Sequence, residues 1–209
     1  MSKVVELRTE YGEAQAKLLN ELFDLPARAS EVDVSMSNAT RETLGNTDFN
    51  RVRAAEGAVF AESERQRVKA AYEQLDLEMR AAVEEAVEEA ERRLSPTDAP
   101  ATDILAAVAA TPEQLLDALD AALQLGEAGE NTALLIFQIG RRRDLSEVIA
   151  RAVDMREDWS EIYEDILEGS SQPDVDPADR FELLAPKSVT KQDILVTPQS
   201  DANIYGALR

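Results

Sequence analysis

The fold of this chain is decided by one long stretch, residues 62–93, which reads ESERQRVKAAYEQLDLEMRAAVEEAVEEAERR. Its apolar side chains recur at steps of three and four residues, at Val68, Tyr72, Leu75, Met79, Ala82, Ala86 and Ala90. This period places them along one face of a helix, with a spacing close to that of a two-helix packing seam. Extended back to about Ala54 and on to Leu94, the helix would be roughly 60 Å long, although Gly57 weakens the prediction for its first turns.

Towards the N-terminus, the sequence predicts one more helix and a long connection. Apolar residues at helical steps predict a helix over residues 3–23, which Asp24-Leu25-Pro26 ends. The helical period is absent from residues 27–53, where Val32, Val34 and Met36 alternate with polar residues as in a short strand. Connections of this length are commonly functional arms or disordered segments. We therefore expect residues 24–53 to form a long contact loop, with a simply mobile segment as the alternative.

Towards the C-terminus, proline and capping signals predict shorter helices. Pro96 and Pro100 interrupt the chain, and a short apolar helix follows as far as Ala109. Thr111 and Gln114 then have the spacing of a capping box, with Pro112 at the first helical position.

Two further helices are expected after this capping box. Residues 133–139 are apolar nearly all round, which is typical of a buried helix or strand, and the helical setting favours a helix. Asp144 is expected to cap a last long helix that continues to about Leu167. Trp159 and Tyr163 lie one turn apart in it, and the core is a more natural place for them than an exposed hot spot.

These elements predict an all-α fold, a helical bundle of five or six helices with a long loop and an extended C-terminal arm. We expect residues 1–169 to form the bundle, including the contact loop 24–53, and residues 170–209 to form the arm. The arm is rich in Ser, Pro and Asp and has two apolar stretches. These are the β-like run Ile194, Leu195 and Val196, and the ending that contains Ile204, Tyr205 and Leu208.

Composition excludes much of the usual chemistry of active sites. The chain has 42 Asp and Glu against 22 Lys and Arg, a formal net charge of −20, and neither His nor Cys. It therefore lacks the usual general base, the usual zinc ligands and the thiol nucleophile. We predict that the protein is not an enzyme and that it holds no cofactor or metal.

The acidic motifs do not change this prediction. The carboxylates between Glu84 and Glu91 lack the His partners of a di-iron bundle and are expected to form a solvated face. Asp174, Asp176 and Asp179 resemble part of a calcium loop, but the required Gly and terminal Glu are missing. An enzyme that uses only carboxylates, or a Ser and Lys pair, stays an alternative, yet no single pair stands out among so many acids.

The candidate sites are therefore surfaces that bind a partner. Arg141, Arg142 and Arg143 form the one basic cluster, at the end of a predicted helix. They are expected either to interact with the helix dipole and nearby carboxylates or to dock onto an acidic partner. The apolar residues of the arm, Ile194, Leu195, Val196, Ile204, Tyr205 and Leu208, are the other candidates.

The acidity has two interpretations. It is compatible with an ordinary acidic protein from a genome of high GC content, and it resembles the composition of proteins from halophilic archaea and their viruses. At molar salt the screening length falls to about 3 Å, so self-repulsion largely vanishes. The net charge disfavours binding to DNA phosphates but would allow DNA to pass an acidic channel without binding. No apolar run reaches 18 residues and no signal peptide is evident, so we expect no membrane contact.

A helical core with an extended C-terminal segment resembles the head-to-tail adaptor (connector) proteins of tailed viruses. The resemblance implies a non-enzymatic virion structural protein, a homo-oligomeric ring that contacts the portal or other virion proteins and lets DNA pass. It implies location in the virion; otherwise we expect a cytoplasmic protein.

Other functions stay open beside this one. The main alternative is a cellular helical interaction module or chaperone-like adaptor. An encapsulated cargo protein is a further alternative, because residues 204–209 resemble the C-terminal targeting peptides of encapsulin cargo.

The halophilic interpretation predicts how stability depends on salt. Because screening removes repulsion between carboxylates, the melting temperature should rise by at least about 5 °C between low and molar KCl. Circular dichroism melting curves at increasing KCl measure this. A melting temperature that does not rise would favour the ordinary acidic protein.

Overall fold

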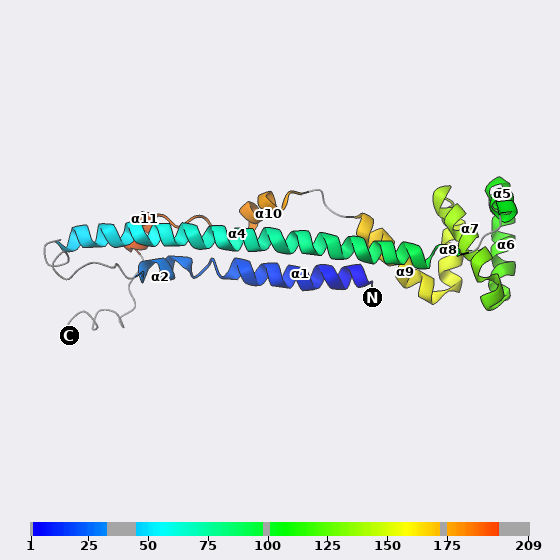
Figure 1. Ribbon diagram of the computed structural model, residues 1–209, viewed down its shortest axis with the longest axis horizontal. Helices are drawn as coiled ribbons and strands as arrows, with labels where there is room; N and C mark the ends of the chain where they lie inside the picture. The colour runs from blue at the N-terminus through cyan, green and yellow to red at the C-terminus, as the bar shows by residue number, and fades with distance from the viewer. Residues whose placement is uncertain (1, 33–44, 98–100, 172–174, 197–209) are drawn as a thin grey trace. The chain divides into compact units, whose positions relative to one another are not determined.

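The computed structural model describes residues 2–32, 45–97, 101–171 and 175–196 (Figure 1). The chain divides into two compact units. Unit 1 comprises residues 1–9 and 79–173, and unit 2 comprises residues 10–78 and 174–209. Two helices contribute to both units, α1 (Lys3–Asn20) and α4 (Asn46–Arg93). No strand occurs in the described ranges, which confirms the predicted all-α fold.

Unit 2 is built around the first part of α4. Three short helices pack there with residues 10–20 of α1: α2 (Leu25–Ser30), α10 (Pro177–Leu184) and α11 (Lys191–Val196). Its core contains Leu22, Leu25, Ala29, Ala54, Ala61, Val68, Tyr72, Phe181 and Ile194. The apolar face predicted for α4 is therefore buried here by segments distant in sequence.

Gly57 lets α2 and α11 approach α4 closely. A Cβ atom at this position would lie 2.3 Å from the backbone oxygen of Ala29 and 3.0 Å from Cδ1 of Ile194. A backbone oxygen cannot move aside as a flexible side chain can. Gly57 weakened the sequence-based prediction of this helix. Tertiary packing explains why a glycine nevertheless lies inside α4.

Unit 1 contains the remaining helices. They are α5 (Ala101–Ala109), α6 (Pro112–Gln124), the 3-10 turn Gly126–Gly129, α7 (Glu130–Arg142), α8 (Ser146–Met155) and α9 (Glu157–Ser170). Helices α6, α7 and α8 pack against one another, and α7 is buried along almost its whole length. The core also includes Leu94, Trp159, Ile162 and Ile166.

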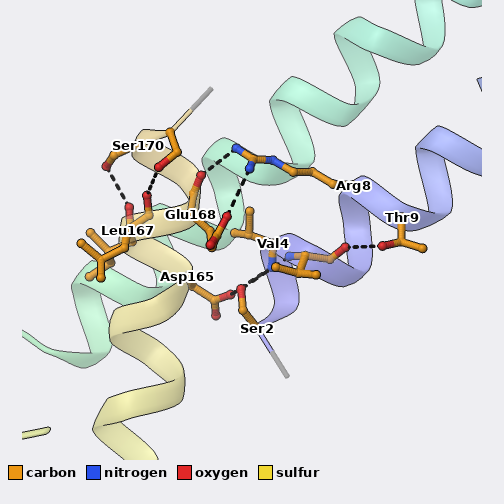
Figure 2. A network of polar contacts seen from close by, with 11 residues as sticks. Ser2, Val4, Arg8, Thr9, Asp165, Leu167, Glu168 and Ser170 are labelled. Atoms are coloured by element: carbon orange, nitrogen blue, oxygen red, sulfur yellow. Dashed lines mark hydrogen bonds and ion pairs between the residues drawn. The ribbon is translucent and has the colours of Figure 1, made fainter. Parts of the chain in front are cut away.

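The start of α1 is held in unit 1 by α9 (Figure 2). The Asp165 carboxylate accepts hydrogen bonds from the Ser2 hydroxyl at 2.7 Å and from the Val4 backbone N–H at 2.9 Å. Arg8 donates to the backbone oxygen of Glu168 at 2.6 Å and forms an ion pair with its carboxylate at 3.4 Å. A carboxylate at a helix N-terminus satisfies unpaired N–H groups and complements the dipole.

Several predicted elements have the expected form. Helix α4 includes all of residues 62–93 and starts earlier than predicted. Thr111 and Gln114 form the reciprocal capping box, with Pro112 at the start of α6. Residues 133–139 lie within a buried helix, and Trp159 belongs to the core.

Other predictions need correction. The expected loop 24–53 contains α2 and the start of α4, and its residues 33–44 with the possible strand lie outside the described ranges. Asp144 does not cap a helix, because its φ of 55° is left-handed; Leu145 precedes α8 instead. The predicted last helix is two helices, α8 and α9, divided at Arg156. In all, residues 3–168 form more helices than the expected five or six.

The expected extended arm also contains regular structure. Residues 177–184 and 191–196 form α10 and α11, and the run Ile194, Leu195 and Val196 is helical where a β-like stretch was expected. Thr190 and Asp193 hydrogen-bond reciprocally at the start of α11, as in a capping box. This local start signal and the burial of Ile194 favour the helix.

The contact at Gly57 predicts that Gly57→Ala destabilises the protein by about 1–3 kcal/mol, because the added methyl group would overlap the Ala29 carbonyl. Gly12→Ala is the matched control: no atom lies within 4 Å of its added Cβ, so the gain in helix propensity should stabilise by about 0.5–1 kcal/mol. Urea unfolding of the full chain measures both. Equal stability of the two variants would contradict the close approach.

Candidate protein-docking site

An apolar pocket in unit 1 is the candidate functional site. It has a volume of about 460 Å³ and lies between α5, α7 and the segment that follows α4. Its lining is formed by Ser95, Pro96, Ile104, Val108, Leu135, Gln138, Ile139, Arg142 and Arg143. Two of the three arginines in the predicted basic cluster therefore border an apolar cavity.

Two hydrogen bonds, from α7 and from the residue that follows it, hold the pocket's borders together. Gln138 Nε2 donates to the backbone oxygen of Leu94 at 2.9 Å, next to the turn that contains Ser95 and Pro96. Arg143 Nη1 donates to the backbone oxygen of Ala110 at 2.8 Å, just beyond the end of α5. Both bonds satisfy carbonyl groups that the helix ends leave without partners.

The two apolar walls differ in exposure. Leu135 and Ile139 on α7 are buried, whereas Ile104 is 40% and Val108 57% exposed on α5. Ala107 and Ala110 pack against the core of unit 1. Ile104 and Val108 are thus left exposed along one side of the pocket.

The border of the pocket is cationic. Arg142 and Arg143 are exposed, and Arg142 lies in the last turn of α7, where the negative end of the helix dipole favours a positive charge. Within the described ranges, the Arg142 guanidinium has no ion pair or hydrogen bond. An apolar cavity beside a guanidinium of this kind suits a partner with apolar side chains and a carboxylate.

Arg141 is separated from the other two arginines. Its guanidinium pairs with Glu91 at 3.3 Å and lies over the ring of Tyr163, 5.7 Å from the ring centre. Tyr163 in turn contacts Phe137 edge to face at 5.4 Å. Arg141 therefore pairs with a nearby carboxylate, one of the two roles expected for the cluster, while Arg142 and Arg143 border the pocket.

The arm residues proposed as partner contacts have different positions. Ile194 is 1% exposed in the core of unit 2, so it stabilises its own unit, whereas Leu195 is 49% exposed. The side chain of Val196 and the residues Ile204, Tyr205 and Leu208 lie outside the description that the structure gives.

One residue of the acidic motif Asp174, Asp176 and Asp179 has a local structural role. Asp176 caps α10 by accepting a hydrogen bond from the Ala178 N–H at 2.8 Å. Among the residues that the structure describes, no group of three or more acids could hold a metal ion. In the same ranges, no helix is both long enough and apolar enough to cross a bilayer.

A buried ion pair holds α10 against α4 in unit 2, and sequence reasoning missed it. Asp76 is fully buried on α4 and accepts a hydrogen bond from Arg180 Nη1 at 2.9 Å. Tyr72 lies one turn earlier on α4 and is buried edge to face against Phe181 at 5.6 Å; burial raises the pKa of its hydroxyl. The sequence offered one signal that Asp76 is buried: it directly follows Leu75, which belongs to the predicted apolar face of the helix.

A more exposed set of charges reinforces the same contact. Glu182 on α10 forms ion pairs with Lys69 at 3.0 Å and with Arg65 at 2.7 Å. The hydrogen bond from Lys69, followed in importance by that from Arg65, lowers the pKa of the Glu182 carboxyl. The guanidinium of Arg65 also lies 5.2 Å from the ring centre of Phe181. These contacts all lie within unit 2.

Comparisons with known proteins do not identify the chain. No protein-family model matches it, and no significant match was found among curated proteins or solved structures. The functional conclusion therefore depends on the geometry of the chain itself.

The buried pair predicts that Asp76→Asn destabilises the protein by about 3 kcal/mol, because it leaves a partly buried guanidinium without its counter-charge. Asp120→Asn is the matched control, since Asp120 pairs with Arg151 at 2.9 Å on the surface and its loss should matter far less. Urea unfolding monitored by circular dichroism compares them. Similar losses in both variants would show that Asp76 and Arg180 do not hold α10 in place.

Proposed function

We propose that this chain is a non-enzymatic assembly component that binds other protein chains through the pocket in unit 1. The observation that supports the proposal is the exposed apolar side of α5, Ile104 and Val108, next to Arg142 and Arg143. Apolar anchors at the centre of a contact, with charged groups at its border, are the usual composition of a protein interface.

The form of the pocket favours a helical partner. Residues from α5 and α7 line it, and its apolar wall on α5 is open to solvent. Grooves between helices commonly bind the apolar face of an amphipathic helix. The partner's apolar side chains would cover Ile104 and Val108, and its carboxylate would pair with Arg142.

The specific form of this proposal is the head-to-tail adaptor of a tailed virus. In that role copies of the chain form a ring, contact a portal or other virion proteins, and line a passage whose acidity keeps DNA from binding. The acidic excess and the helical fold are the features that support it. A cellular interaction module or chaperone-like adaptor would use the same pocket for a foreign helix.

The proposal predicts assembly that depends on α5. In molar KCl the full chain should form particles whose mass is a multiple of the 23.0 kDa monomer. Val108→Asp should weaken this assembly at least about tenfold, because a charge in an apolar contact is costly to bury. Light scattering after size-exclusion chromatography measures the mass.

Val59→Asp is the matched control, because Val59 is 71% exposed on α4 and lies outside the pocket. It should assemble like the unchanged chain. A monomer under all salt conditions, or equal masses for the two variants, would contradict the proposed function.

A further inference from the structure

We propose that the occupant of the pocket is the segment Asp201 to Leu208 of a second copy of this chain. The inference rests on the proposed function and deepens it by naming the partner. It also gives a role to the apolar residues Ile204, Tyr205 and Leu208 of the sequence.

The sequence of this segment has the pattern of a groove-binding helix. Asp201, Ile204, Tyr205 and Leu208 are spaced at i, i+3, i+4 and i+7. In a helical conformation these four side chains would share one face, which is the arrangement that anchors amphipathic helices in apolar grooves. The residues between them are small or polar, Ala202, Asn203, Gly206 and Ala207.

The chemistry of this face complements the pocket. Ile204, Tyr205 and Leu208 supply apolar groups for the walls formed by α5 and α7. Asp201 supplies one carboxylate at the end of the pattern, and Arg142 is an exposed guanidinium without a partner in the described ranges. Arginine and carboxylate groups form paired hydrogen bonds that are stronger than those between neutral groups.

Within the described ranges, the inward faces of the packed helices are already buried. The inward faces of α6, α7, α8 and α9 form the core of unit 1, and Ile194 of α11 belongs to the core of unit 2. The segment must come from a second copy if it is to join chains, because binding within one copy would cover the pocket without producing an assembly.

A complementation experiment with the full chain tests this directly. Leu208→Asp damages the segment and leaves the pocket intact, whereas Val108→Asp damages the pocket and leaves the segment intact. Each variant alone should be monomeric in molar KCl. An equimolar mixture should contain a dimer, because one intact pocket and one intact segment can still meet; analytical ultracentrifugation measures this species.

Charge reversal tests the polar contact. Arg142→Glu should weaken assembly at least tenfold, and the double variant Arg142→Glu with Asp201→Arg should restore it. Leu195→Asp is the matched control, because Leu195 is 49% exposed on α11 but lies outside the segment, and it should assemble normally. Circular dichroism melting should show that all variants are folded.

The outcomes separate this inference from the proposed function. If Val108→Asp prevents assembly but Leu208→Asp and Tyr205→Asp do not, the pocket binds a different partner and only the inference fails. If both classes of variant are monomeric and their mixture is too, the segment does not join two copies. If the unchanged chain is a monomer in every salt condition, both proposals fail together.

Discussion

The structure depends on the burial of one apolar face of α4. This face supplies Ala54, Ala61, Val68 and Tyr72 to the core of unit 2 and Val83, Ala86 and Ala90 to the cores of unit 1. Since most of these residues are small or β-branched, their partners must approach the helix closely. Glycines at the contacts permit that approach: Gly57 faces the Ala29 carbonyl, and a Cβ at Gly169 would lie 2.1 Å from Val87 Cγ2.

Electrostatics determines where the acidic excess is tolerated. Most described carboxylates are exposed or paired on the surface, as in the chain of contacts from Arg28 to Glu64 to Arg67, where hydrogen bonds from both arginines lower the pKa of Glu64. Asp76 is the buried exception, and it has Arg180 as counter-charge. In the described ranges most arginines pair with carboxylates or carbonyl groups, whereas the exposed guanidinium of Arg142 borders an apolar pocket.

Local signals in the sequence were sufficient to predict much of the fold. The repeat from Val68 to Ala90 and the capping box at Thr111 depend on neighbouring residues, so they could be recognised without a structure. The division at Arg156 could not, because it depends on tertiary contacts: Arg156 pairs with Glu130 at 3.1 Å and stacks on Trp159 at 5.1 Å. Helices α10 and α11 were missed although Asp176 and Thr190 mark their starts, since the polar composition around them suggested an arm. The site was predictable only in part. The basic cluster was evident from the sequence. The structure separates Arg141 from Arg142 and Arg143, and this separation depends on how α7 packs against α5 and α9.

The central claim is that the exposed side of α5 becomes covered when chains assemble. Hydrogen exchange of the full chain, followed by mass spectrometry at low and high protein concentration in molar KCl, tests it most directly. The account predicts that the amides of α5 and of residues 201–208 become protected together as the concentration rises. Exchange in α5 that is the same at both concentrations would contradict it.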